Sequence, residues 1–258
     1  MDQVALDLSA ALKDRVGGFF HNTRDIAGVT CRVCSGPGSP LCGPCREQQV
    51  AFGDQLADRV LTLAYATGNA PQYHQSAFHM RAYKQPGAPS EKARDDLALM
   101  VVAASYIHGR CVGAASPAPW NAVTFIPSVT RPGPTHPVAD LARRVYGLAP
   151  DRRFLLDLGP TATDPSRSVR RDTFRVSEQW SAHVRGAHVL VVDDTWTTGS
   201  KAQSAALAVR AAGAAFVTVL CVARWCRYDW PDHRALLALC PEPYDASICP
   251  VTRGLCAA

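Results

Sequence analysis

The sequence lacks an apolar run of the ~20 residues that a membrane-spanning helix requires. Its longest apolar stretches cover only residues 97–107 and 214–223 of the 258. The first residues, MDQVALDLSA, carry an early acid and have no basic segment before an apolar core, so they do not resemble a secretory signal. The sequence therefore predicts a cytoplasmic protein that makes no contact with a membrane.

Lysine is also scarce. Only 4 of the 27 positively charged residues are lysines, against 22 acidic residues and a formal net charge of +5. Because the guanidinium of arginine binds phosphate through two parallel hydrogen bonds, this composition favours an anionic ligand. Net charge alone does not distinguish nucleic acid from a small phosphorylated molecule.

Several common motifs are missing as well. The sequence contains no GxGxxG, GxxxxGK[ST], HExxH or GxSxG pattern. It therefore gives no support to a dinucleotide fingerprint, a Walker A loop, a zinc protease helix or a nucleophile elbow. The composition itself, 47% hydrophobic and 19% charged, is that of a folded globular protein.

The apolar spacing predicts an α/β fold. Helical periodicity predicts helices over residues 3–20, 90–108, 137–146 and 200–212. Short apolar runs predict strands over residues 121–127, 154–158, 188–192 and 216–222, and residues 59–65 fit either a strand or a helix end. Strands that are apolar on both faces indicate a buried parallel sheet flanked by helices. The polar, arginine-rich segment 159–175 predicts a mobile loop.

Residues 188–203, HVLVVDDTWTTGSKAQ, contain the most informative pattern. An apolar strand ends in Asp193 and Asp194, and a Thr/Gly/Ser loop then leads into a helix. Backbone N–H groups of such a loop and of the helix N-terminus form a phosphate site. The candidate phosphate-binding residues are Thr195, Thr197, Thr198, Gly199 and Ser200. The two acids would repel a phosphate, so they predict a diol or a diol-bound Mg²⁺ beside it. The pattern therefore indicates a ribose 5-phosphate site.

The ten cysteines are the other unusual feature. Cys31 and Cys34 form one CxxC pair and Cys42 and Cys45 another, with seven residues between the pairs. This spacing predicts one tetrahedral metal site, with structural zinc favoured over an iron–sulfur cluster, redox pairs or disulfides. Cys111 and Cys221 are expected to be core thiols. Cys226, Cys240, Cys249 and Cys256 have no CxxC spacing, and a second metal site involving His233 is disfavoured.

Two resemblances follow from these motifs. VVDDTWTTGS closely resembles the phosphoribosyl-diphosphate loop of type I phosphoribosyltransferases, and a four-cysteine module preceding such a loop is similar to the ComF family. Residues 81–84 (RAYK), residues 125–131 (FIPSVTR) and residues 170–174 (RRDTF) resemble further segments of that family. The resemblance covers roughly residues 28–225, and the sequence departs from it at Ser200, Lys201 and after Pro127.

The resemblance implies a type I phosphoribosyltransferase-like domain over residues 49–258, a zinc module over 28–48 and a leader helix over 1–27. It implies transfer of ribose 5-phosphate from phosphoribosyl diphosphate, with Mg²⁺, to an unidentified nitrogen acceptor. Asp193 and Asp194 would stabilise the transition state, and Arg131 and Lys84 would hold diphosphate. Arg170 or Arg171 would enter the site from a lid.

The alternative reading is a non-catalytic protein that binds phosphoribosyl diphosphate or a nucleotide, because a phosphate loop does not by itself establish turnover. Its zinc module would contact a protein or single-stranded DNA, in DNA uptake or nucleotide metabolism. The module lacks a dense basic and aromatic stripe, which argues mildly against direct DNA binding. The sequence leaves a homodimer open.

Overall fold

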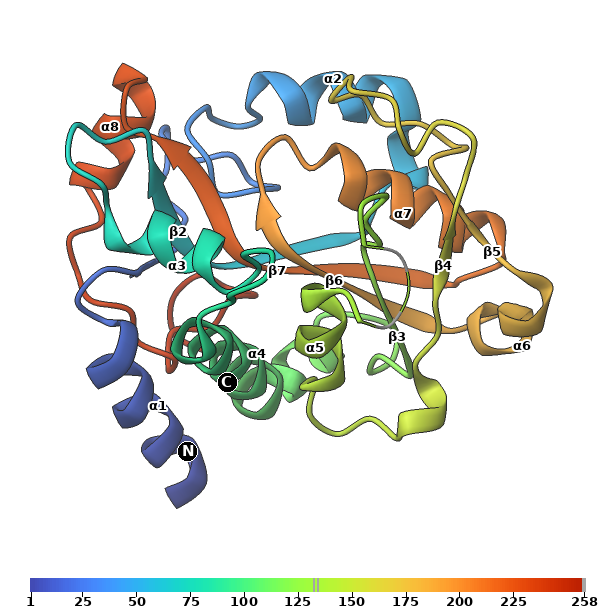
Figure 1. Cartoon of the computed structure of the whole chain (residues 1–258), viewed down its shortest axis with the longest axis horizontal. Helices are drawn as coiled ribbons and strands as arrows, with labels where there is room; N and C mark the ends of the chain where they lie inside the picture. The colour runs from blue at the N-terminus through green and yellow to red at the C-terminus, as the bar shows by residue number, and fades with distance from the viewer. Residues whose placement is uncertain (132, 134, 257–258) are drawn as a thin grey trace.

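A computed structural model describes residues 1–131, 133 and 135–256. Its centre is a five-stranded sheet in the order β1-β2-β7-β6-β3 (Figure 1). The strands are β1 (His21–Asn22), β2 (Arg59–Gly68), β7 (Phe216–Arg227), β6 (His188–Trp196) and β3 (Ala122–Phe125). The four longer strands are parallel, and β1 pairs with β2 in the antiparallel direction. The sheet is therefore mixed, whereas the sequence pattern predicted a parallel one, because β1 adds an edge of only two residues.

Helices cover both faces of this sheet, as Figure 1 shows. One face carries α1 (Gln3–Val16), α3 (Gln75–Ala82), α4 (Glu91–Ala114) and α5 (Pro137–Arg143), and the other carries α2 (Gly43–Phe52) and α7 (Ser200–Ala211). Side chains of β6 alternate between the two layers: Leu190 and Val192 pack in the first, and Val189 and Val191 in the second. The predicted α/β class with helices flanking the sheet is confirmed.

Smaller elements complete the fold. The strands β4 (Leu156–Leu158) and β5 (Phe174–Val176) form an antiparallel pair beside the main sheet. The segment expected to be a loop, 159–175, therefore ends inside β5, and Gly159 N–H donates to Thr173 O at 2.8 Å. The remaining helices are α6 (Ser181–Val184), α8 (Pro231–Ala238) and the 3₁₀ turns Gly53–Gln55, Pro150–Arg152 and Glu178–Trp180.

The helix α4 is longer than its predicted range. Ser90 caps it by accepting from the Ala93 N–H at 3.3 Å, as its sequence position indicates, and the helix runs on to Ala114. It is long and apolar enough to cross a membrane by composition alone. Its Leu97, Met100 and Val101 face the hydrophobic layer beneath the sheet, however, and are completely buried. Such burial is that of a core helix, which passes the same compositional test.

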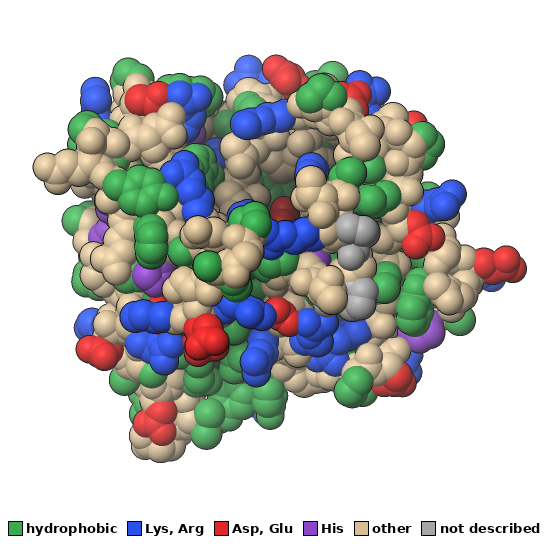
Figure 2. All heavy atoms as spheres, in the orientation of Figure 1, with side chains coloured by type: hydrophobic (Ala, Val, Ile, Leu, Met, Phe, Trp, Pro, Cys, Tyr) green, Lys and Arg blue, Asp and Glu red, His purple; other side chains and the backbone are tan. Residues whose placement is uncertain are grey.

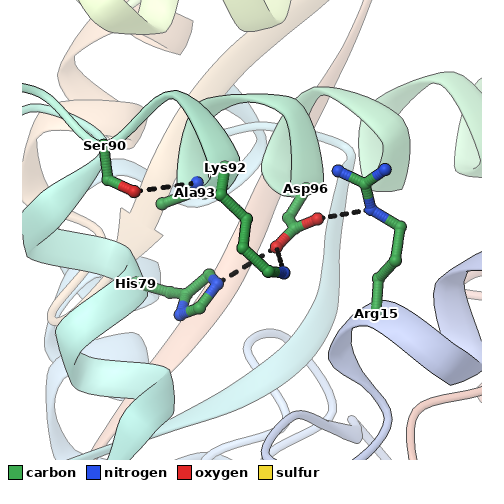
Figure 3. A network of polar contacts seen from close by, with 6 residues as sticks. All are labelled: Arg15, His79, Ser90, Lys92, Ala93 and Asp96. Carbon is green, nitrogen blue, oxygen red and sulfur yellow. Dashed lines mark hydrogen bonds and ion pairs between the residues drawn. The ribbon is translucent and has the colours of Figure 1, made fainter.

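One buried carboxylate ties three helices together (Figure 3). Asp96 of α4 accepts from Arg15 of α1 at 2.6 Å, from Lys92 at 2.8 Å and lies 3.1 Å from His79 Nε2 of α3. Burial raises the pKa of Asp96, but these partners outweigh burial and lower it below the ordinary value. The network fixes α3, whose C-terminal end carries Tyr83 and Lys84 toward the cavity described next.

Candidate functional site

A cavity of about 600 Å³ lies where the parallel strands end. Ligands of open α/β sheets bind at this edge, because strand ends and the loops after them meet there. Figure 2 shows a hollow on this face, with acidic atoms deep inside it and Lys and Arg side chains around it. The polar and charged side chains of its lining are Asn69, Arg81, Lys84, Ser128, His136, Arg167, Asp193, Asp194, Thr195, Thr197, Lys201 and Arg227.

The lining carries more positive than negative charge. It includes five cationic side chains, two from the region of α3, one from segment 159–175, one from α7 and one from β7: Arg81, Lys84, Arg167, Lys201 and Arg227. Only Asp193 and Asp194 are acidic in the described lining. A cavity of this kind suits an anionic ligand that also presents a neutral or cationic part to the two acids.

The two acids are held differently. Asp194 accepts from Lys84 Nζ at 2.6 Å and from the Tyr83 hydroxyl, and Lys84 outweighs burial to lower its pKa. The Asp193 carboxylate accepts from the Asp194 backbone N–H at 2.9 Å. Burial and the charge of Asp194 raise the pKa of Asp193 to about 8. A bound cation or hydrogen-bond donor would therefore stabilise the ionised form of Asp193.

The loop after β6 is shorter than predicted. The sequence placed Thr195 in a phosphate loop, whereas β6 continues through Trp196 and pairs Thr195 with Ala223 of β7. The strand extends because buried Trp196 packs in the layer beneath α7. The turn between strand and helix is therefore Thr197–Gly199, and the Thr195 backbone is committed to the sheet.

Two structural features explain why position 199 is a glycine. Its φ is +79°, in the left-handed region that favours glycine, where it begins α7. A Cβ there would also lie 2.1 Å from the indole of Trp196. At this turn the Thr198 hydroxyl lies 3.3 Å from the Ser200 hydroxyl and 3.5 Å from the Ser200 backbone nitrogen. The turn presents backbone and hydroxyl donors at the N-terminus of a 12-residue helix.

The other residues predicted for the site do not all line the 600 Å³ cavity. Lys84, Asp193, Asp194 and Thr197 meet in the cavity, and Thr198 lines a neighbouring cavity of about 410 Å³. Arg131 is outside the described lining, although its charge reaches the half-buried His136 and the buried Tyr83.

The two arginines expected to enter from a lid have other partners. Arg170 pairs with Asp164 at 2.6 Å, and the Arg171 guanidinium lies over the Phe52 ring. Arg167 lines the cavity in their place.

Sequence reasoning missed several lining residues. Arg167, Arg227 and His136 carry no motif of their own, and the sequence indicates no role for Arg81 within the RAYK segment, so only the tertiary fold brings these side chains together. His136 caps α5 and stacks on Phe125, and burial lowers its pKa. Its imidazole is therefore neutral near pH 7, and because Nδ1 accepts from the Val138 N–H at 3.2 Å, its proton lies on Nε2.

The four N-terminal cysteines meet in one buried cluster. All ligand atoms of Cys31, Cys34, Cys42 and Cys45 lie within 4.8 Å of one another, and Cys34 Sγ lies 3.7 Å from Cys42 Sγ. Their side chains pack in the hydrophobic layer on the α7 face of the sheet. This cluster could hold a metal ion such as zinc, as the two CxxC pairs predicted.

A buried arginine partly offsets the negative charge of the cysteine sulfurs. Arg224 of β7 is 5% exposed, hydrogen-bonds Cys34 and has its pKa raised because the thiolate charges of Cys34 and other cysteines outweigh burial. Within residues 1–131, 133 and 135–256 no carboxylate pairs with it, and its Nε has no hydrogen-bond partner. Gly36 makes room, since a Cβ there would lie 2.3 Å from the guanidinium. Four thiolates around one divalent ion carry a net charge of about −2, which this cation partly offsets.

The helix that begins at the cysteine cluster, α2, also contacts the Thr197–Gly199 turn. Cys42 begins α2, and Cys45 lies in its first turn. Gln48, one turn further along α2 and nearly buried, donates to the Thr198 carbonyl at 2.9 Å. The cluster therefore positions α2, and α2 supports the backbone of the turn that follows Asp193 and Asp194.

The six other cysteines comprise three single thiols and three members of a second group, which the sequence did not indicate. Cys221, Cys226 and Cys240 are buried single thiols. The expectation that Cys111 is a core thiol is wrong. It is half-buried and lies with His108, Cys249 and Cys256 in a second group whose ligand atoms are within 4.8 Å of one another.

The histidine considered for a second site, His233, belongs elsewhere. It accepts from the Arg227 N–H at 3.0 Å.

Comparison with known proteins adds no further assignment. No protein-family model matches the chain, and no curated protein matches it.

Proposed function

We propose that this protein binds phosphoribosyl diphosphate in the 600 Å³ cavity and transfers ribose 5-phosphate to a nitrogen acceptor, as a ComF-like member of the type I phosphoribosyltransferases. One observation supports this above the others. Asp193 and Asp194 lie near the end of β6, separated by two residues from the Thr197–Gly199 turn that leads into α7, and the acids and Thr197 line a cavity that has five cationic side chains.

The turn is the proposed site of the 5′-phosphate. Thr197, Thr198 and Ser200 offer hydroxyl groups there, and the first N–H groups of α7 have no partner within the helix. Lys201, in the first turn of α7, adds a positive charge to the same cavity. A phosphate dianion bound here would be stabilised by the helix dipole and by this ammonium.

The acids are the proposed site of the ribose hydroxyls. A diol donates two hydrogen bonds, which matches two adjacent carboxylates better than a second phosphate does. The anomeric carbon gains positive charge as its bond to diphosphate breaks, and the carboxylates would stabilise that charge. The electron pair of the broken bond leaves with diphosphate, and the attacking nitrogen forms the new bond and then loses a proton. That proton would pass to solvent water, because the only acceptor nitrogen of neutral His136, Nδ1, already accepts from the Val138 N–H at 3.2 Å.

The donor set also fits a divalent cation. Asp193 is a partly buried carboxyl group whose pKa is raised by burial and by the charge of Asp194, and carboxylate oxygen is the ligand that Mg²⁺ prefers. Mg²⁺ bound with the substrate would neutralise the charge of the leaving diphosphate. Arg81, Lys84 and Arg227 would bind the diphosphate oxygens, with Arg131 contributing from the loop after β3.

The four-cysteine cluster is the proposed zinc site. A tetrahedral ion with bonds of ~2.3 Å to sulfur places the sulfurs ~3.8 Å apart, which matches the 3.7 Å between Cys34 and Cys42. An iron–sulfur cluster distributes its cysteines over several metal atoms and separates them further than the 4.8 Å seen among all four. Zinc is therefore favoured, with a structural role in supporting the Thr197–Gly199 turn through α2.

The alternative is a binding protein of the same fold. Lys84 and Tyr83 already hydrogen-bond Asp194, so a ligand must displace or share these contacts. A change in these contacts on ligand binding is compatible with a sensor as well as with an enzyme. A protein partner or single-stranded DNA would then contact the zinc module, in a cytoplasmic protein that acts as a monomer or a homodimer.

Release of diphosphate separates the two functions. We expect the wild-type protein with Mg²⁺ and phosphoribosyl diphosphate to release diphosphate when the correct base or amine of a panel is supplied. Asp194→Asn should lose at least tenfold of this rate, while Asp151→Asn, at an exposed acid outside the cavity, should keep it. Tight binding without release for any acceptor would favour the sensor.

A further inference from the structure

The second sulfur-rich group joins two distant parts of the chain. His108 and Cys111 lie three residues apart on α4 and therefore share one face of the helix. Cys249 and Cys256 come from the C-terminal segment, more than a hundred residues later. Their four ligand atoms all lie within 4.8 Å of one another. Each is a free cysteine or an imidazole nitrogen, so no disulfide accounts for their approach.

The histidine is oriented as a metal ligand. Its Nε2 lies 2.8 Å from the Ala246 carbonyl oxygen, which can only accept, so Nε2 carries the proton. The lone pair of Nδ1 therefore points toward the sulfurs, and Nδ1 lies 3.5 Å from Cys256 Sγ. A metal-ligating histidine commonly donates its other N–H to a backbone carbonyl in this way, which fixes the ring and its tautomer.

The segment between the two later cysteines forms a tight turn. The Cys249 N–H donates to Gly254 O at 2.8 Å, and the Arg253 N–H returns to Cys249 O at 2.7 Å. Arg253 adopts a positive φ of +59°, which a non-glycine residue does only where the surroundings require it.

We propose that His108, Cys111, Cys249 and Cys256 bind a second zinc ion through three thiolates and one imidazole. Three soft sulfur ligands with one nitrogen are a donor set of structural zinc sites, and all four positions of the tetrahedron are filled by protein. Cys111 is half-buried and Cys256 exposed, so the site opens to solvent on one side and the ion can enter there.

The proposed second site reinforces the first. The side chain of Arg253, inside the turn, donates to the carbonyls of Arg32 and Val33 at 3.0 and 2.9 Å and to Cys31 at 3.4 Å. These carbonyls belong to the first CxxC pair. A metal at the second site would therefore hold the C-terminal turn against the N-terminal cluster, in addition to fixing it to α4.

Metal content of the full chain tests this proposal. We expect zinc-equilibrated, chelator-washed wild-type protein to hold about two zinc ions per chain, and Cys256→Ser to hold about one. Cys256 is exposed, so its replacement should leave the fold intact. Cys240→Ser, at a buried cysteine outside both groups, is the matched control and should keep about two. Cobalt-substituted Cys256→Ser should lose a large part of the thiolate-to-metal absorption of the wild type, whereas Cys240→Ser should not.

Two results would overturn the proposal. One is a single zinc ion in the wild-type protein that Cys256→Ser leaves unchanged. The other is a disulfide among Cys111, Cys249 and Cys256 in protein that is freshly purified under anaerobic conditions without reductant, found by mass spectrometry of peptides. Loss of the first site alone, in Cys34→Ser, should remove one ion and leave the cobalt signal of the second, so the two sites can be scored separately.

Discussion

The four-cysteine cluster and the acid cavity both bring groups of like charge together, but neighbouring residues compensate that charge differently at the two sites. At the cluster, the Arg224 guanidinium lies against the sulfurs and the surrounding layer is apolar. At the cavity, Lys84 and Tyr83 satisfy Asp194, while Asp193 has a raised pKa. A bound metal would use all four sulfurs of the cysteine cluster. In the acid cavity, by contrast, the Asp193 carboxyl group is available to a ligand.

This difference separates stability from function within a single hydrophobic layer. The sulfurs of Cys31, Cys34 and Cys45 pack in the same cluster as Trp196, whose strand carries both acids. Replacing a residue of the four-cysteine cluster should therefore lower stability, and replacing a residue of the acid cavity should change ligand binding. At Asp193 the replacement should even raise stability. The following variants test that separation, from the largest expected effect to the smallest.

Cys34→Ser should have the largest effect. It removes a thiolate from the buried cluster and leaves Arg224 without its partner, so we expect loss of metal and a decrease of more than about 4 kcal/mol in the free energy of unfolding. Urea denaturation with metal analysis measures both. Cys240→Ser, buried outside the cluster, should cost far less, and equal losses for the two variants would contradict the assignment.

Gly199→Ala should combine both kinds of effect. The added Cβ meets Trp196 and must adopt a positive φ, which should cost about 2–4 kcal/mol of stability and displace the turn proposed for the phosphate. Thermal unfolding and phosphoribosyl-diphosphate binding measure the two effects. Gly18→Ala, where a Cβ has open space and φ is not positive, is the matched control. A Gly199→Ala protein with unchanged binding would show that the turn does not hold the ligand.

Asp193→Asn should stabilise the ligand-free protein by an amount that grows as the pH rises. The pKa of Asp193 is raised to about 8, so the folded state keeps a proton that the unfolded chain releases above its ordinary pKa near ~4. The wild type therefore loses stability as pH rises from about 4 to about 8, and asparagine removes that loss. We expect a gain of about 1–3 kcal/mol at pH 9, absent at pH 4.

Denaturant curves of both proteins across this range, without ligand or divalent cation, provide the measurement. A gain of the same size at pH 4 would mean that packing rather than charge is responsible.

Gln48→Ala should have the smallest effect. It removes one hydrogen bond from α2 to the Thr198 carbonyl, worth about 1 kcal/mol. Because that carbonyl belongs to the turn proposed for the phosphate, ligand affinity should fall a few-fold while the metal content stays unchanged. Calorimetry and elemental analysis together check this, with exposed Gln49→Ala on the same helix as the control. Normal affinity in Gln48→Ala would mean that the cluster and the turn act independently.

The sequence predicted the local features of the fold well. Apolar runs located β3, β6 and β7, Ser90 marked the start of α4, and two CxxC pairs indicated the metal cluster. Each of these depends on neighbours within a few residues. The end of β6 was predicted four residues too early, because Asp193 and Asp194 look like the start of a loop when their pairing with β7 is unknown.

Features assembled from distant segments could not be predicted in the same way. Arg224 sits in an apolar strand and gives no sign of the cysteines it contacts, nearly two hundred residues earlier. The group of His108, Cys111, Cys249 and Cys256 lacks the short spacing that identifies the first cluster. Arg81 and Arg167 line the cavity only because α3 and the segment after β4 approach the same strand ends.

Calorimetric titration of phosphoribosyl diphosphate with Mg²⁺ tests the central claim most directly. We predict saturable binding of one ligand per chain by the wild-type protein, at least tenfold weaker binding by Asp193→Asn/Asp194→Asn, and wild-type binding by Asp151→Asn. The double variant should remain folded and retain its zinc, because the cysteine cluster is separate from the acids. No binding by folded, zinc-loaded wild-type protein, or equal binding by the double variant, would contradict the account.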